Sequence, residues 1–275
     1  MNKINYPLIV SDFDGTLVNK DGTIAESNKK AISEYISAGG TFAISTGRMP
    51  AGILSRAKEL ELKGVMCCCQ GAIVMDIESG EIISEGRLPL ETTIAIVKKM
   101  EEMGLHIHVY DQWDFYCNMD DFALKYYEKA TRCKAKLVLD KPLSKFVEEN
   151  GICSYKVLAM VDTEDNEKVL NELAKENFEG CELTKSDENL VEVINAKYSK
   201  GTAVRFLAEH FNTPLEKTVA IGDQLNDLPM IEMAGLGVAV QNADQGLKKA
   251  ADYICEYTNE EGAVGKIIEK FGFNK

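Results

Sequence analysis

The fold is predicted from one short stretch of the chain, Leu8-Ile9-Val10-Ser11-Asp12-Phe13-Asp14-Gly15-Thr16-Leu17. Aliphatic and β-branched residues suit a strand covered on both faces, so residues 8–10 predict a buried strand. Gly15 permits a tight turn directly after it. Ligands bind at the carboxyl ends of strands in an open α/β sheet, and residues two apart on an extended chain lean the same way. We therefore expect Asp12 and Asp14 in one crevice; the alternative is that both only cap backbone amides in a polar turn.

Length and composition bound the class of protein. The 275 residues suit one large domain or two smaller ones, and 45% hydrophobic with 27% charged residues is typical of a globular protein. The excess of Asp and Glu (44) over Lys and Arg (31) gives a net charge of −13. Nucleic acid and anionic membranes are therefore disfavoured as partners, and an anionic substrate would need local help from a cation.

The sequence predicts a cytoplasmic protein with reduced thiols. Met1 to Tyr6 is polar and precedes no apolar signal segment, and no run approaches the roughly 18 apolar residues of a membrane span. The eight cysteines include Cys67-Cys68-Cys69 but no Cys-x-x-Cys pair. A disulfide framework is not expected in a chain of this length, so we expect residues 67–69 to be small hydrophobes in a buried strand.

Strands and helices alternate in the first part of the chain, as in a parallel sheet covered by helices. Gly39-Gly40 ends a helix whose apolar residues recur at helical spacing. The elements expected next are a strand at Thr41–Ser45, a helix to about Leu60, a strand at Val65–Cys69, and a hairpin of Ile73–Asp76 with Glu81–Ser84.

The rhythm changes near Glu85, where short strands and helices predict an inserted α+β module. It returns late in the chain, with a strand at Thr218–Ile221 that runs into Gly222-Asp223. We therefore expect a two-domain α/β protein, in which two linkers between the domains would allow hinge closure. The core domain is predicted at residues 1–83 and 190–275, and the α+β domain at residues 84–189.

Four groups of polar residues lie at a strand end or a helix start, and in a parallel sheet these ends converge on one crevice. They are Asp12 with Asp14, Thr46-Gly47-Arg48, Lys200-Gly201, and Gly222-Asp223 with Asn226-Asp227. The three carboxylates expected in the crevice, Asp12, Asp14 and Asp223, repel one another unless a cation is present, and hard oxygen ligands with few protein donors favour Mg²⁺. A threonine hydroxyl, helix-start amides and a lysine are groups that bind a phosphate.

In these four motifs the sequence resembles the haloacid dehalogenase superfamily, and most of all the Cof-type phosphatases with a large cap of class II, subtype B. The motifs stand here as Asp12-Phe13-Asp14-Gly15-Thr16-Leu17, Thr46-Gly47-Arg48, Lys200-Gly201 and Gly222-Asp223-Gln224-Leu225-Asn226-Asp227. The resemblance covers essentially the whole chain and implies a Rossmann-like parallel-sheet core with an inserted α+β cap. Two departures, Gln70-Gly71-Ala72 for Asn-Gly-Ala and Val240-Gln241-Asn242-Ala243 for Met-Gly-Asn-Ala, touch neither the nucleophile nor the metal positions.

The resemblance assigns the chemistry to Asp12 and Asp14. Asp12 is the expected nucleophile that forms an aspartyl-phosphate. An unperturbed Asp, with a pKa of about 3.9, is ionised at pH 7 and needs no activating base. Asp14 is the expected acid that protonates the leaving alkoxide, and then the base that activates water. These roles require the two carboxyl groups to have different pKa values.

The resemblance also assigns a metal site. Mg²⁺ is expected on Asp12, on the backbone carbonyl of Asp14 and on Asp223, where it neutralises charge and orients the phosphoryl group. Asp227 is expected to support the metal through its ligands or through water. On its spacing alone, Asp227 is equally well explained as a helix cap.

Phosphate oxygens are expected on Thr46, the amide of Gly47 and Lys200, with Asn226 as a further or water-mediated partner. Lys200 would offset negative charge in the transition state. Alternatives remain open: Lys197 competes with Lys200, Ser45 competes with Thr46, and Arg48 fits a structural ion pair as well as a phosphate ligand.

One polar-aromatic group lies in the inserted module, in a predicted strand–turn–strand region. The functional hypothesis is a specificity patch on the cap, and the alternative is ordinary half-buried sheet residues. Only three histidines occur, and the third, His210, lies on a predicted helix, so we do not expect a histidine metal centre. The residues of the group are His106, His108, Tyr110, Asp111, Trp113 and Tyr116.

The sequence thus predicts a Mg²⁺-dependent hydrolase of small phosphate monoesters, such as sugar phosphates or related metabolites, that acts as a monomer or weak homo-oligomer. A phosphomutase would return the phosphoryl group to a sugar, and flavin or pyridoxal phosphates are alternative substrates. A transport ATPase is disfavoured, because it needs membrane helices. A non-catalytic protein that binds phosphorylated metabolites would show degenerate motifs, and every catalytic motif position is intact here.

Overall fold

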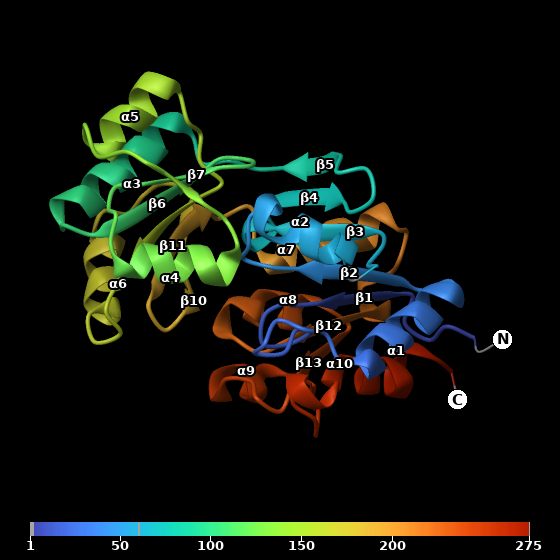
Figure 1. The fold of residues 1–275 in the computed structure, drawn as a ribbon. Helices are drawn as coiled ribbons and strands as arrows, with labels where there is room; N and C mark the ends of the chain where they lie inside the picture. Colours follow the sequence, from blue (N-terminus) through green and yellow to red (C-terminus); the bar gives the residue numbers. More distant parts are fainter. Residues whose placement is uncertain (1–2, 60, 275) are drawn as a thin grey trace. The chain divides into compact units, whose positions relative to one another are not determined.

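The computed structural model describes residues 3–59 and 61–274, and the chain divides into two compact units (Figure 1). The first unit comprises Met1–Thr46, Arg56–Ser84 and Ser199–Lys275, and the second comprises Gly47–Ser55 and Glu85–Tyr198. Each unit has its own sheet.

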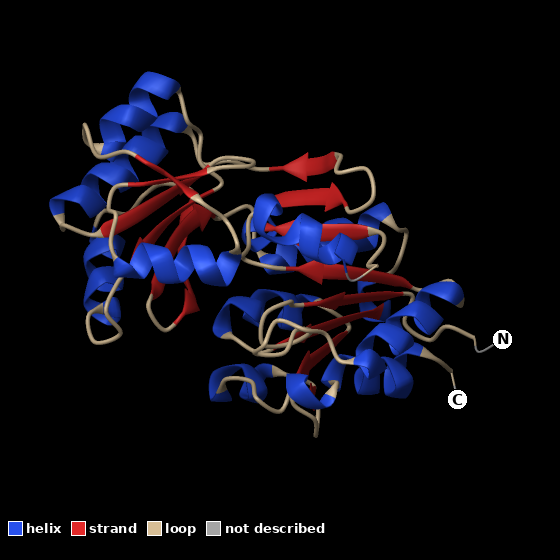
Figure 2. Cartoon of the chain, viewed as in Figure 1, coloured by secondary structure: helices blue, strands red, loops and turns tan. Residues whose placement is uncertain are grey.

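An eight-stranded sheet forms the frame of the first unit, in the order β14-β13-β12-β1-β2-β3-β4-β5. The strands from β14 to β3 run parallel, and β4 is antiparallel to β3 (Figure 2). Helix α1 packs against α10, and α7 packs against α8. The bounds are β1 (Leu8–Ser11), α1 (Glu26–Ser37), β2 (Thr41–Ser45), α2 (Pro50–Glu59), β3 (Val65–Cys68), β4 (Ile73–Asp76), β5 (Ile82–Glu85), α7 (Lys200–His210), β12 (Thr218–Gly222), α8 (Leu228–Met233), β13 (Leu236–Ala239), α9 (Gln245–Ala250), β14 (Tyr253–Ile254) and α10 (Ala263–Ile267).

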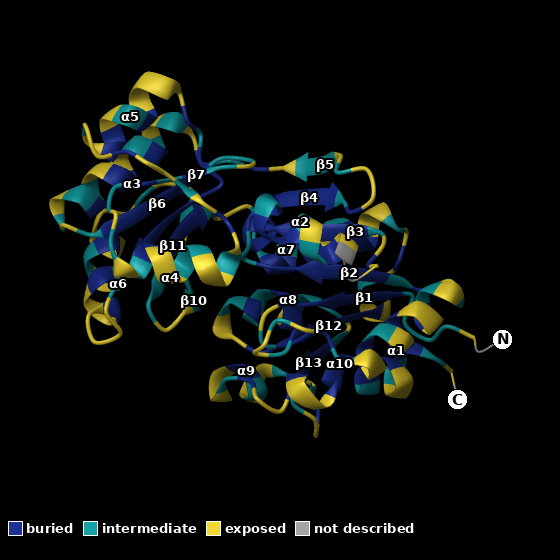
Figure 3. Ribbon diagram, viewed as in Figure 1, coloured by how far each residue is buried: buried dark blue, intermediate teal, exposed yellow. Residues whose placement is uncertain are grey.

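The central strands of this sheet are buried, as their apolar sequences predict. Residues 8–10 of β1 have no exposed surface, and Figure 3 shows β1, β2 and β12 as largely buried. The predicted parallel α/β core is therefore confirmed. In each parallel pair the carboxyl ends lie side by side, which brings the polar residues beyond them to one edge of the sheet.

The cysteines are free thiols, as predicted. Cys67 and Cys68 lie fully buried in β3, but Cys69 belongs to a short 3-10 helix that follows the strand, at a φ of 50°. Cys153 and Cys181 are half-buried, whereas the other six cysteines are buried. Burial raises the pKa of the Cys67 thiol to about 12, so this thiol is protonated at neutral pH.

A six-stranded sheet forms the frame of the second unit, in the order β10-β11-β9-β6-β7-β8. Its strands pair antiparallel, except that β8 runs parallel to β7. The bounds are α3 (Leu90–Glu102), β6 (His106–Tyr110), β7 (Phe115–Cys117), α4 (Phe122–Thr131), β8 (Ala135–Leu137), α5 (Leu143–Asn150), β9 (Lys156–Met160), α6 (Asn166–Lys175), β10 (Cys181–Asp187) and β11 (Leu190–Asn195).

The two faces of the second sheet differ in character. Ile107 and Val109 of β6 belong to an apolar core that also contains residues of α3, α5 and α6. The alternate residues of β6 face the other way, where the ring of His108 lies 4.8 Å from that of Tyr127 of α4. The second face is therefore polar and aromatic although it is buried.

The boundary between the units differs from the predicted one. We expected the first domain to resume at residue 190, but β11 pairs with β9 and β10, so the second unit extends to Tyr198. Val191 and Val193 of β11 pack in the apolar core of the second unit. A buried strand has the same apolar sequence pattern in either sheet, so the sequence does not show which strands it pairs with.

The helix predicted to reach about Leu60 is seen as Pro50–Glu59, and Leu60 lies outside the described residues. Among the residues that the structure describes, every helix is too short or too polar to cross a lipid bilayer.

Candidate active site

The predicted site residues of the first unit follow the ends of three neighbouring strands. Ser11 pairs with Ile221 of β12 and with Ile44 of β2, so Asp12 and Asp223 lie just beyond adjacent strand ends. The Asp12 amide donates to the carbonyl of Ile221 at 2.8 Å and continues the ladder by one residue. Thr46 follows β2 in the same way and is 1% exposed.

Three carboxylates meet at this edge, and we call Asp12, Asp223 and Asp227 the carboxylate cluster. They are buried, and each offers an oxygen within 4.8 Å of the others. The Thr16 hydroxyl donates to Asp223 Oδ1 at 2.7 Å. Asp227 Oδ2 accepts hydrogen bonds from the amides of Asp223 and Gln224, at 2.9 and 3.1 Å, so this carboxylate also caps the turn in which it lies.

Lys200 places an ammonium group against this cluster. Its Nζ donates to Asp12 Oδ1 at 2.6 Å and to Asp227 Oδ1 at 2.5 Å, and its side chain is 1% exposed. Ser199 caps helix α7 through a hydrogen bond from the Thr202 amide, which fixes where the helix begins. Lys197, the alternative to Lys200, is exposed.

The electrostatics of the cluster show an excess of negative charge. Burial raises the pKa of Asp12 well above its usual range, and Asp227 raises it further, whereas Lys200 opposes the shift. Burial and Asp227 raise the pKa of Asp223 to about 7, against the hydrogen bond from Thr16. Burial alone would lower the pKa of Lys200, but Asp12 and Asp227 outweigh it and raise the value. One buried ammonium does not balance three buried carboxylates.

The raised pKa of Asp12 corrects our expectation of an unperturbed carboxylate. The expectation neglected burial, which disfavours the charged form. A divalent cation beside Asp12 and Asp223 would restore ionisation, because an opposite charge at close range favours a carboxylate. The all-oxygen donor set suits a hard cation such as Mg²⁺.

Two glycines allow the backbone to lie close to the side chains of the carboxylate cluster. Gly15 has a φ of 77°, a region that favours glycine, and a Cβ there would lie 2.4 Å from Asp223 Oδ2. A Cβ on Gly222 would lie 2.5 Å from the Cβ of Asp227. Neither position has room for a larger residue.

Asn226 lies near the cluster with an unsatisfied group. Its Nδ2 donates to Gln70 Oε1 at 3.2 Å, and its buried Oδ1 has no hydrogen-bond partner among the described residues. Gln70 has a φ of 60°, which Asn adopts more readily than Gln. Gln70, which replaces the usual Asn of the family motif, therefore lies beside the site. Its hydrogen bond with Asn226 was not predicted, because the two residues are far apart in the sequence and meet only in the folded chain. Thr16 was also missed, although its hydroxyl stands inside the first motif.

The remaining predicted residues lie outside the carboxylate cluster. The Asp14 side chain is exposed, and its predicted metal contact uses the backbone carbonyl instead. Gly47 is grouped with the second unit, where its carbonyl accepts a hydrogen bond from Lys156 Nζ at 2.9 Å. Arg48 Nη1 donates to the Thr131 carbonyl at 3.4 Å in the same unit.

The aromatic group predicted in the inserted module is divided between two faces and a turn. His106, His108 and Tyr110 share the polar face, whereas Tyr116 packs against the apolar core. Asp111 forms an ion pair with Arg87 at 2.7 Å, and Trp113 is 44% exposed.

Comparison with known proteins identifies the family. A family model described as haloacid dehalogenase-like hydrolase matches residues 9–268. The 5-amino-6-(5-phospho-D-ribitylamino)uracil phosphatase YcsE of Bacillus subtilis is 31% identical over 270 residues, which cover 96% of this chain and 95% of that protein. Phosphatase YwpJ of Bacillus subtilis is 28% identical over 282 residues, which cover 95% of this chain and 98% of that protein.

The fold is shared as well. A haloacid dehalogenase-like hydrolase from Bacteroides thetaiotaomicron has a TM-score of 0.83 at 29% identity, over 96% of this chain and 99% of that chain. The chain therefore belongs to the haloacid dehalogenase-like hydrolase family and, like the phosphatases it matches, is an enzyme of the phosphatase class.

Proposed function

We propose that this chain is a Mg²⁺-dependent phosphatase that hydrolyses small phosphate monoesters through an aspartyl-phosphate on Asp12. The observation that carries the proposal is the carboxylate cluster with Lys200, which gathers three buried carboxylates and one ammonium at the strand ends. Such a group is costly to bury unless further positive charge binds there. It therefore supports a site that receives both a cation and a phosphate.

Asp12 and Asp223, with the carbonyl of Asp14, would hold Mg²⁺. Asp227 would stabilise the site indirectly, because it accepts hydrogen bonds from Lys200 and from the backbone amides of the turn. When bound, the ion supplies positive charge that neutralises the phosphoryl oxygens and the carboxylates. The unsatisfied Oδ1 of Asn226 suits a donor such as a water molecule at the site.

The reaction would proceed in two steps on the side chains. Asp12 attacks phosphorus, the ester P–O bond breaks, and the leaving alkoxide takes a proton from Asp14. Asp14 then takes a proton from a water molecule, which cleaves the phospho-enzyme to inorganic phosphate and free Asp12. Lys200 stabilises the negative charge that develops, and Thr46 binds phosphate oxygens.

The substrate class is a small phosphorylated metabolite, with sugar phosphates and related compounds first. The similarity to YcsE adds the phosphorylated ribitylaminouracil named for that protein as a candidate. We propose that the second unit selects among these compounds. The free cysteines favour a reducing compartment such as the cytoplasm, and the net charge of −13 disfavours nucleic acid as a partner.

The test is turnover of an aryl phosphate with Mg²⁺, with a chelator, and by the Asp12→Asn variant. Activity should vanish with the chelator, return with Mg²⁺, and fall by more than about 10³-fold in Asp12→Asn, because the nucleophile is lost. Unchanged turnover by a folded Asp12→Asn variant would refute the mechanism. A bisphosphorylated sugar distinguishes a phosphomutase by its products, and binding of a sugar phosphate without turnover in Mg²⁺ would indicate a non-catalytic protein.

A further inference from the structure

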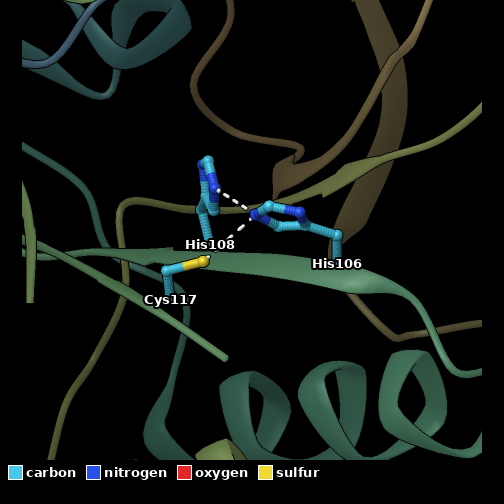
Figure 4. A group of neighbouring side chains, drawn as sticks. All are labelled: His106, His108 and Cys117. Carbon is cyan, nitrogen blue, oxygen red and sulfur yellow. Dashed lines mark hydrogen bonds between the residues drawn. The ribbon is translucent and has the colours of Figure 1, made fainter. Parts of the chain in front are cut away.

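Two adjacent strands of the second unit bring two histidines and a cysteine together. His106 and His108 lie two residues apart on β6, so both side chains leave the same face of the sheet. The register pairs His108 with Cys117 of β7. His106 Nε2 lies 3.0 Å from His108 Nε2 and 3.1 Å from Cys117 Sγ (Figure 4). We call His106, His108 and Cys117 the histidine–cysteine cluster; all three are buried, with donor atoms within 4.8 Å of one another.

Outer partners hold both imidazole rings in place. His106 Nδ1 lies 3.0 Å from Asp121 Oδ2, and His108 Nδ1 lies 3.3 Å from the Tyr110 hydroxyl. A metal-binding histidine usually makes such a bond through its other ring nitrogen, which fixes the tautomer and the ring orientation. The Nε2 atom of His106 thereby faces both His108 Nε2 and Cys117 Sγ.

The proton positions distinguish two states of this cluster. When His106 Nδ1 donates to Asp121, its Nε2 has a single lone pair, and both His108 and Cys117 lie within hydrogen-bond distance of it. A cation at the centre would accept a lone pair from all three atoms. Without a cation, His108 can donate to His106, and the thiol can donate to the Met119 carbonyl at 3.1 Å.

We propose that His106, His108 and Cys117 bind a zinc ion within the second unit. Two imidazole nitrogens and one thiolate match zinc, which favours nitrogen and sulfur ligands, whereas Mg²⁺ requires oxygen. Three protein ligands leave one position of a tetrahedral ion for water. The ion would join β6 to β7 and, through Asp121, to the start of α4, which the same Asp121 caps.

The surroundings are compatible with an added positive charge. Lys156 lies on the same face, but its ammonium is paired with Glu192 at 2.6 Å, and Asp121 adds a negative charge beside His106. A histidine binds zinc through a neutral ring. Burial raises the pKa of the Cys117 thiol to about 11, so zinc must displace its proton.

One member of the cluster, His106, lines a pocket of the second unit. A pocket of about 580 Å³ lies within the second unit, and His106, Met119 and Asp121 are among its lining residues. A cation can therefore approach His106 without unfolding of the sheet.

The test uses the full chain, stripped of metal, kept reduced without added thiols, and held in excess Mg²⁺ so that the carboxylate cluster is occupied. Titration with Co²⁺, a spectroscopic substitute for zinc, should give a thiolate-to-cobalt charge-transfer band that saturates at one equivalent and is displaced by Zn²⁺. Cys117→Ser should abolish the band. The matched controls, Cys133→Ser at a buried cysteine of the same unit and His210→Gln at the remaining histidine, should retain it.

Absence of the band in the wild-type chain, or its persistence in Cys117→Ser, would overturn the proposal. If Cys117→Ser does not fold, X-ray absorption on the zinc-loaded wild-type chain decides. The proposal expects one sulfur at about 2.3 Å and nitrogens at about 2.0–2.1 Å. A shell without sulfur would place zinc elsewhere, for example on the carboxylate cluster, and would refute the site without touching the proposed phosphatase activity.

Discussion

The carboxylate cluster of the first unit and the histidine–cysteine cluster of the second are both buried, but they differ in donor atoms and in position. The first offers only oxygen and lies in the loops beyond parallel strand ends. The second offers nitrogen and sulfur and lies on the face of an antiparallel sheet. One chain therefore presents a hard donor set and a borderline-soft one, which select different cations.

This difference indicates different tasks. Loops at strand ends leave room for a substrate and carry reactive groups on a rigid frame. The histidine–cysteine cluster lies in the middle of a sheet, and of its three members only His106 lines the neighbouring pocket. We therefore propose that the chemistry takes place at the carboxylate cluster and that an ion at the histidine–cysteine cluster would hold β6 and β7 together.

Among the variants that compare the two clusters, Lys200→Ala is expected to have the largest effect, because it should impair the carboxylate cluster and leave the histidine–cysteine cluster unchanged. Activity should fall by about 10²- to 10³-fold, because charge stabilisation in the transition state is lost. The free energy of unfolding should fall by about 3–5 kcal/mol, because Asp12 and Asp227 lose a buried partner. Enzyme assays and urea unfolding measure the two quantities.

Lys197→Ala, at the exposed neighbouring lysine, is the control and should change neither quantity. The cobalt band of the second unit should persist in Lys200→Ala. Activity within about threefold of wild type in that variant would remove Lys200 from the mechanism.

A smaller effect is expected from Gly222→Ala, which tests whether the carboxylate cluster needs its tight backbone. The new Cβ would meet the Asp227 side chain, so this carboxylate must shift. We expect a loss of about 10²-fold in activity, measured as kcat/KM, from misplacement, and about 1–3 kcal/mol in stability from overpacking. Gly39→Ala, where a Cβ meets open space at a φ of 97°, should cost stability alone. Equal activities of the two variants would contradict the expectation.

The smallest effect is expected at Asp121, which separates helix capping from support of His106. Asp121→Ala removes the acceptor for the Leu124 amide and should cost about 1 kcal/mol in thermal or urea unfolding. Asp121→Asn retains the cap and should leave metal-free stability nearly unchanged. Both variants should weaken cobalt binding by about 10- to 100-fold, because the negative charge beside His106 Nδ1 is lost. Wild-type affinity in both variants would show that Asp121 only caps α4.

The sequence predicted the parallel core well, because its strands are apolar and each ends in a recognisable polar motif. Asp12 and Asp223 could be placed together for the same reason, because parallel strands bring their carboxyl ends to one edge, whereas Lys200, at the start of α7, was placed by its motif. What could not be predicted were the pKa shift of Asp12 and the bond between Asn226 and Gln70. Both depend on how the side chains pack in the folded protein.

The second unit was harder to predict. Cys117 was not associated with the histidines, because cross-strand neighbours depend on the register of β6 against β7, which the sequence pattern leaves open. Tyr116 was grouped with His106, although it faces the apolar core. The first domain was predicted to resume at residue 190, which assigned the strand at Leu190–Asn195 to it. The sequence does not show that this strand pairs with β9.

The distribution of the thiols has a practical consequence for studying the chain in solution. Six cysteines are buried in the two units, and Cys153 and Cys181 alone are half-buried. An alkylating reagent should modify these two first, and the protected thiols only as each unit opens. Mass spectrometry of the labelled positions would then report the local opening rate of either unit from one sample, without an introduced probe.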